Sequence, residues 1–302
     1  MHADRRKILH LMGAGGSYLA MTGGAIAATP HPVLWRVEKS GATVHILGFA
    51  DARDRSWLTP AIARAFQDSK EIWFEVPQRD PTAPPPEAAA PQAANTPAQP
   101  PGYSERSLFD VLPSQLSARL LAAAQKYGVS RESLEHVRPW RAYFVVNGAY
   151  LTKNPIGAAD LENFPDIVLS DMAYRAKKIV HSEFATGAEA MAHFTGMPDS
   201  EAIERLEFLL AFYDDEAAGR LSDRYDWIFG RSTTSAIDRM RTRWPALYQD
   251  EQVSRNVGWA RRIQGFLDKG GTYFVVIGLQ HTLGPDSLIV QLRRNGLRPR
   301  AA

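Results

Sequence analysis

The 302-residue chain contains no cysteine. This absence excludes structural disulfides, thiol catalysis and any zinc or iron–sulfur site that needs cysteine ligands. The chain also lacks a large excess of basic over acidic residues, or of acidic over basic residues. Lys and Arg total 35 and Asp and Glu total 33; without residues 1–28, which hold three basic residues and one acidic residue, each total falls to 32. Because acidic and basic residues balance after residue 28, there is no electrostatic reason to expect nucleic acid or an anionic membrane surface as a partner.

Long hydrophobic runs are missing after residue 28, so we expect no later membrane span. The first 28 residues have the pattern of an export signal. Arg5 and Arg6 precede a weakly apolar segment, Leu11 to Ala28, and Ala25-Ile26-Ala27 supplies a small–x–small cleavage pattern. The paired arginines favour the twin-arginine (Tat) route, and an ordinary Sec signal or an N-terminal anchor helix is the alternative. The sequence thus predicts a periplasmic or secreted protein with no stable membrane span after cleavage.

The rest of the chain, residues 29–302, is long enough for one large domain, and 45% hydrophobic content suffices for its core. Residues 77–102 are rich in Pro and Ala and show no periodicity, which predicts a disordered insert. Residues 103–270 are mostly helical in pattern. We expect an α/β (α+β) fold in which this helical region is inserted between two strand-containing halves.

Two short apolar runs share one pattern. Thr43 to Asp51 ends in Gly48-Phe-Ala-Asp51, and Gly271 to His281 ends in Gly278-Leu-Gln-His281. Each run predicts a buried strand that stops at a glycine, where the backbone can leave the strand sharply. We expect the two strands to lie side by side in a central mixed sheet, each followed by a helix and a further strand. The repeated pattern favours an internal duplication.

Four polar residues follow apolar runs at positions where a sheet edge would gather them: Asp51, Glu75, Glu183 and His281. Ligands of open α/β sheets bind beyond the carboxyl ends of the strands. One histidine with two or three carboxylates can bind a divalent cation, and the same groups can act as acid and base without metal. Each residue alone is also compatible with a helix cap or a histidine bonded to the backbone. His136 and His193 are interpreted as surface or packing residues.

Several segments, in order along residues 32–300, resemble the TraB/GumN family: Leu34-Trp-Arg-Val, Val44 to Asp51, Ile72-Trp-Phe-Glu75-Val, Arg255-Asn256-x-x-Trp259, and Phe274 to His281 with Gly284-Pro-Asp. The resemblance implies two Gly-x-x-His motifs and a glutamate in one site, and kinship with the Tiki-type metalloproteases, whose activity depends on those groups. Glu75 and His281 match these positions, and Glu183, Arg255 and Asn256 stand where the family tends to keep polar residues.

The chain departs from the family pattern at its first motif, which ends in Asp51 instead of His. Aspartate shifts the preference of a metal site from zinc towards harder ions. The change is equally compatible with a homologue that has lost its metal.

The resemblance therefore predicts an exported, metal-dependent hydrolase, peptidase-like, that acts on a peptide or another small substrate. Asp51, Glu75 and His281 would hold Mn, Zn, Co or Mg. Glu75, Glu183 and His281 would be catalytic, and Arg255 and Asn256 would bind substrate. The alternatives are a non-catalytic periplasmic binding or accessory protein of envelope or polysaccharide processes, and a metal-free hydrolase that uses Glu75 and His281 as base and acid. The sequence does not indicate the oligomeric state.

Overall fold

The computed structural model describes residues 29–50, 52–78, 80, 102–153, 162–218, 220, 222–232 and 234–302. The predicted signal at residues 1–28, most of the insert at 77–102, and Asp51 lie outside these described residues. Within the described part, no helix is long and apolar enough to cross a membrane.

A six-stranded mixed sheet has the order β4-β3-β5-β2-β1-β6. Strands β4, β3, β5 and β2 run parallel, and β1 and β6 are antiparallel additions at the other edge. The strands are β1 Leu34–Lys39, β2 Ala42–Phe49, β3 Glu71–Phe74, β4 Ile179–Ser182, β5 Thr272–Gly278 and β6 Arg300–Ala301. Phe49 pairs with Gly278, so the two strands with the glycine pattern are neighbours in register. The predicted mixed α/β class and the pairing of these two strands are confirmed.

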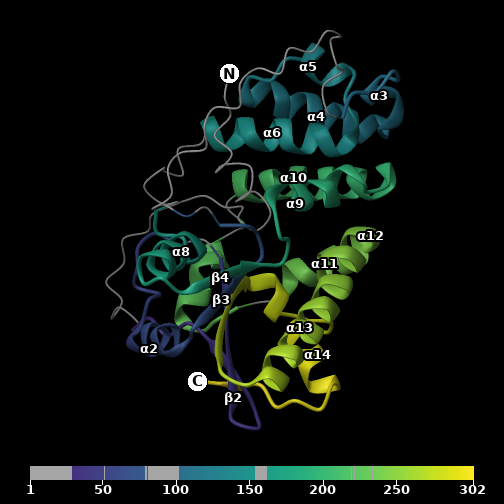
Figure 1. Ribbon diagram of the computed structural model, residues 1–302. Coiled ribbons are helices and arrows are strands. Elements are labelled where there is room, and N and C mark those ends of the chain that lie inside the picture. The colour runs from purple at the N-terminus through teal and green to yellow at the C-terminus, as the bar shows by residue number, and fades with distance from the viewer. Residues whose placement is uncertain are drawn as a thin grey trace.

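Helices cover both faces of the sheet (Figure 1). On one face lie α2 Pro60–Asp68 and α8 Pro165–Arg175, and on the other lie α13 Arg255–Lys269 and α14 Leu288–Arg294. Side chains of β5 alternate between the two cores: Phe274 and Val276 pack on the first face, and Val275 and Ile277 on the second. Because both faces are covered, the central strands are continuous apolar runs instead of alternating ones.

Local sequence explains how the first strands are shaped. Ser40 and Gly41 both have positive φ, 51° and 84°, as a two-residue hairpin turn between β1 and β2 requires. The Thr59 hydroxyl accepts a hydrogen bond from the Ile62 N–H and caps α2. A Cβ at Gly48 would come within 2.7 Å of Thr282 Cγ2. Gly48 therefore allows the end of β2 to approach the turn that carries His281.

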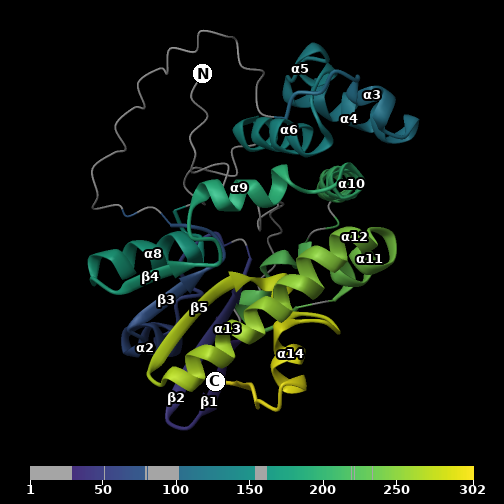
Figure 2. The same ribbon diagram turned by 45° about the vertical axis from the view of Figure 1, so that its right-hand side comes forward.

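The helical region lies beyond the carboxyl ends of the parallel strands, with α9 and α10 nearest to the sheet (Figure 2). Its own core is formed mainly by α4, α6 and α10, and includes Leu120, Val146 and Leu206. The region comprises α3 Leu108–Val111, α4 Ser114–Tyr127, α5 Glu132–Glu135, α6 Pro139–Lys153, α9 Gly187–Thr195 and α10 Asp199–Ala217. The amphipathic helices predicted for this region are present, with ends shifted by a few residues.

The segment after α10 differs most from the sequence-based expectation. Ser222–Phe229 is a 3₁₀ helix (η2) within the region whose pattern predicted mostly helix. The chain then forms α11 Ser235–Arg243, α12 Pro245–Tyr248 and a π-helical turn, η3 Gln249–Ser254, which leads directly into α13. These elements were not predicted, because their apolar residues are few and Pro245 interrupts the pattern. The further strand predicted after the second glycine pattern is β6.

Candidate functional site

The carboxyl ends of three adjacent parallel strands bring together three of the predicted site residues. Glu183 follows β4, Glu75 follows β3, and His281 lies in the 3₁₀ turn η4, Leu279–Thr282, which follows β5. Asp51 comes two residues after the end of β2, the next strand in the sheet, but it is outside the described residues. The order of the strands, not any local spacing, creates this group of side chains.

His281 is fully buried and makes two side-chain contacts. Its Nδ1 lies 2.9 Å from Asn256 Oδ1, and its Nε2 lies 3.0 Å from Glu75 Oε1. The Asn256 amide donates its N–H to the carbonyl of Asp286 at 3.0 Å, which orients its oxygen towards the histidine. Nδ1 is therefore the hydrogen-bond donor to Asn256. Nε2 faces a carboxylate oxygen, an arrangement that requires a proton or another cation between the two atoms.

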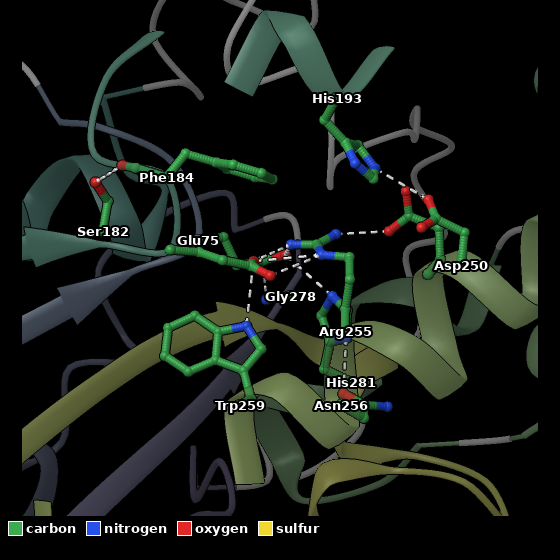
Figure 3. Close-up of polar contacts among 12 residues, drawn as sticks. Glu75, Ser182, Phe184, His193, Asp250, Arg255, Asn256, Trp259, Gly278 and His281 are labelled. Carbon is green, nitrogen blue, oxygen red and sulfur yellow. Dashed lines mark hydrogen bonds and ion pairs between the residues drawn. The ribbon is translucent and has the colours of Figure 1, made fainter. Parts of the chain in front are cut away.

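Arg255 stands at the centre of the polar cluster (Figure 3). Its Nη2 donates to Glu75 Oε1 at 2.8 Å and to Glu183 Oε2 at 2.6 Å, and its Nη1 donates to Glu251 Oε2 at 2.6 Å. Trp259, one turn further along α13, donates its indole N–H to Glu183 at 3.2 Å. One guanidinium group thus fixes three carboxylates that come from distant parts of the chain.

Both oxygens of the Glu75 carboxylate have hydrogen-bond partners in the protein. Its second oxygen accepts a short hydrogen bond from the backbone N–H of Gly278. Burial by itself would raise the pKa of Glu75, but the charge and hydrogen bond of His281, together with Arg255 and Gly278 N–H, lower that pKa to about 2. Glu75 is consequently ionised at neutral pH despite its position in the interior.

The cluster continues from Arg255 to the helical region. Glu251 also accepts a short hydrogen bond from Arg205 of α10, and Arg205 donates to Asp250 Oδ2 at 2.9 Å. His193 of α9 lies 3.0 Å from the same Asp250 oxygen, on the opposite side of Arg255 from Asn256 (Figure 3). The hydrogen bond to Asp250 raises the pKa of His193. His193, interpreted from sequence as a surface or packing residue, is thus part of the charged cluster.

The two residues predicted to bind substrate, Arg255 and Asn256, both make contacts inside the cluster. Asn256 is fully buried, and both ends of its amide are engaged, so it orients His281. Arg255 is 7% exposed and directs its donors at three glutamates. Sequence reasoning missed Glu251 and Asp250 of the π turn, and Arg205. The one available signal was the spacing of Glu251, Arg255 and Trp259, which places all three on one side of a helix.

The described residues include no group of three or more His, Asp and Glu side chains arranged to hold a metal ion. Two of the three predicted ligands, Glu75 and His281, are nevertheless adjacent. A separation of 3.0 Å between Glu75 Oε1 and His281 Nε2 is compatible with two ligands of one tetrahedral or octahedral ion. Asn256 holds the other ring nitrogen, as an outer hydrogen-bond partner of a metal-bound histidine does. The residues present therefore fit part of a metal site.

Comparisons with known proteins give one match. A model of the TraB/PrgY/gumN family matches residues 33–301, which is nearly the whole chain after the predicted export signal. Searches of curated proteins and of solved structures find no match. The resemblance found in the sequence motifs is thus confirmed at the level of the family.

Proposed function

The chain belongs to the TraB/PrgY/gumN family, and we propose that it is a metal-dependent hydrolase whose reaction centre is built on Glu75 and His281. The observation that carries the proposal is the pairing of these two side chains. His281 is oriented through Asn256 so that Nε2 points at a glutamate that is ionised in the interior. A histidine nitrogen and a carboxylate oxygen held in this way supply two ligands to a divalent cation.

The charge of the cluster supports a cation at this place. Five carboxylates contact two guanidinium groups, so acidic groups outnumber arginines by three. The guanidinium groups belong to Arg205 and Arg255, and the carboxylates are Glu75, Glu183, Glu201, Glu251 and Asp250. Buried charge without compensation is costly. A divalent ion would offset two of these three charges. Asp51, which follows the neighbouring strand, is the third ligand in this proposal.

A bound Mn²⁺, Zn²⁺, Co²⁺ or Mg²⁺ would supply an activated water by lowering the pKa of the water towards about 7. The residues of the chain have separate tasks around it. Asn256 keeps the proton of His281 on Nδ1, and Arg255 keeps Glu75 ionised and holds Glu183 in place. Glu183, whose side chain is 14% exposed, is the carboxylate that would accept a proton from the reacting water.

The proposed substrate is a peptide bond, in line with the kinship of the family motifs to the Tiki-type metalloproteases. The proposed place of action is the periplasm or the exterior of the cell, reached by the twin-arginine route. The double substitution of Arg5 and Arg6 by Lys would then abolish export, measured as the fraction of protein in the periplasm. Unchanged export of this variant would contradict the twin-arginine route.

A second candidate is a non-catalytic binding or accessory protein of the cell envelope. One observation favours it: Glu75 already accepts hydrogen bonds from Arg255, Gly278 and His281, and His281 has no exposed surface. A centre in which every polar atom has a protein partner needs neither water nor metal. In a metal-free hydrolase, Glu75 and His281 would have to move away from these partners before either could exchange a proton with a substrate.

The metal content of the purified protein distinguishes the metal-dependent hydrolase from the two metal-free alternatives. The protein, purified without chelators, is analysed for Mn, Zn, Co and Mg, alongside the His281→Ala variant. We expect close to one ion per chain in the native protein and its loss in His281→Ala. His181→Ala is the matched control, because His181 is also paired with a glutamate, Glu71, at 3.0 Å. Metal-free native protein, with a melting temperature that does not respond to Mn²⁺, Zn²⁺ or Co²⁺, would refute the metal-dependent function.

Two further variants distinguish a hydrolase from a binding protein that retains metal. Glu183→Gln should keep the metal but lose cleavage of a mixed peptide library, since Glu183 is the proposed proton acceptor.

Asp51→His tests the departure from the family motif. If Asp51→His creates metal affinity that the native protein lacks, the native site has lost its metal and the non-catalytic function is favoured.

A further inference from the structure

We propose that a pocket between α4, α10 and α11 binds a small dianion, such as a phosphorylated or polycarboxylate compound. The pocket has a volume of about 230 Å³ and is separate in its residues from the cluster around Glu75 and His281. Four arginines line it, from two helices and a connecting segment: Arg119, Arg220, Arg239 and Arg243. Convergence of four guanidinium groups on one pocket is the observation from which the inference starts.

The acidic residues nearby are fewer than the arginines. Asp215 is shared by Arg220 at 2.7 Å and Arg239 at 2.5 Å. Glu207 is shared by Arg243 at 2.8 Å and Arg119 at 3.9 Å, and Arg119 also contacts Asp214 at 2.7 Å. Three carboxylates thus serve four guanidinium groups, and only Asp214 and Asp215 of these three line the pocket.

Donors exceed acceptors in the pocket because each guanidinium has five N–H groups. Arg239 shows the surplus directly: its Nε is buried and has no hydrogen-bond partner among the described residues. A buried donor without an acceptor is unfavourable. An oxyanion in the pocket would provide acceptors for the surplus N–H groups of the four lining arginines without displacing the existing ion pairs.

The chemistry of the lining favours an anion with several oxygens over a halide. Guanidinium groups bind carboxylate and phosphate through parallel N–H bonds, and four of them can contact different oxygens of one tetrahedral group. The volume of about 230 Å³ exceeds that of a bare phosphate, so it leaves room for an organic part. The ligand class is therefore a small molecule with a phosphate or clustered carboxylates.

Binding is measured by isothermal titration of the full chain with inorganic phosphate, glycerol phosphate and citrate, at constant ionic strength. We expect saturable one-site binding that weakens as salt increases. Arg239→Gln should weaken binding about 10-fold or more, because a charge-assisted hydrogen bond is lost. Arg241→Gln is the matched control, since Arg241 lies on the same helix, contacts Asp238 and does not line the pocket. This control should bind as the native protein does.

Asp214→Asn gives a test of opposite sign. Asp214 lines the pocket and its side chain is 63% exposed, so the variant should fold normally. Removal of its negative charge should strengthen binding by a factor of about 3 to 10.

The three ligands distinguish the two classes of anion. If glycerol phosphate binds more tightly than phosphate and citrate, the ligand is a phosphomonoester. If citrate binds most tightly of the three, the ligand is a polycarboxylate. No saturable binding at millimolar concentrations of all three, or equal loss in Arg239→Gln and Arg241→Gln, would overturn the proposal.

Discussion

Two histidine–glutamate pairs lie at the two ends of β3. Glu71, at its start, is 3.0 Å from His181 of β4, and Glu75, just past its end, is 3.0 Å from His281. The residue types and distances are the same. The side chains of the first pair are about one-third exposed, whereas His281 has no exposed surface and Glu75 has 10%. The pairs thus differ in their surroundings and not in their own chemistry.

The surroundings give the second pair its properties. Glu75 is also bonded to Arg255 and to the backbone of Gly278, and His281 is held by Asn256. His181 instead stacks on Trp73, with ring centroids 4.4 Å apart. An exposed pair is screened by water and contributes little free energy, while a buried, fully bonded pair is strongly coupled to its neighbours. The comparison teaches that two histidine–glutamate pairs of equal distance are distinguished by the residues that surround them.

The largest effect is expected from removal of the residue that most separates the two pairs. Arg255→Gln would leave Glu75, Glu183 and Glu251 in the interior without their shared cation. Loss of one partner from a buried ion pair costs about 3–5 kcal/mol, and three carboxylates are affected here. We expect destabilisation by at least this amount in chemical denaturation at pH 7.

A control on the same helix makes this prediction specific. Arg261 is exposed, and Arg261→Gln should change the free energy of unfolding by less than about 0.5 kcal/mol. If Arg255→Gln were no more destabilised than Arg261→Gln, the two histidine–glutamate pairs would not differ in the way that their surroundings indicate.

The sequence predicted one part of this arrangement well. Glu75, Glu183 and His281 each follow an apolar strand, and the parallel order of β4, β3 and β5 places them together. The pattern of strand, glycine and polar residue is local, and local patterns with strong apolar character are visible in a sequence. The fold class and the edge of the sheet where the site lies could be predicted for this reason.

The partners of these residues could not be predicted in the same way. Asp250 and Glu251 lie in a π-helical turn that has no distinctive sequence, and Arg205 and His193 come from the helical region. Glu251 and Arg255 are four positions apart on one helical side, but the contacts of Arg205 and His193 with this turn join residues 45 or more positions apart, and no spacing reveals those. A sequence also does not show that the amide of Asn256 lies between His281 and the carbonyl of Asp286.

The next largest effect concerns pH. Glu75 has a pKa of about 2 in the folded protein against 4.5 ordinarily. A carboxyl whose pKa is lowered by folding adds stability above its unfolded pKa and loses it as the pH falls. Glu75 should therefore contribute about 3 kcal/mol at neutral pH, and this contribution should disappear between pH 4.5 and pH 2.

Glu75→Gln isolates this contribution from that of other carboxylates. The free energy of unfolding is measured from pH 6 to pH 2 for the native protein and the variant. The variant should be less stable at pH 6, and the difference between the two should narrow as the pH falls below 4.5. A constant difference over this range would show that Glu75 is not held ionised by its neighbours.

The smallest effect is expected at the exposed pair, and it completes the comparison. Glu71→Gln should cost no more than about 1 kcal/mol in the free energy of unfolding, because water already solvates both partners and His181 keeps its stacking on Trp73. The cost should shrink further in 1 M salt, where exposed charges interact only over about 3 Å. Glu75→Gln should retain most of its cost in the same salt, since its partners are buried. The two glutamates share one strand and one type of partner, so an equal response to salt would mean that burial does not distinguish them, and the site at Glu75 and His281 would lose its main physical justification.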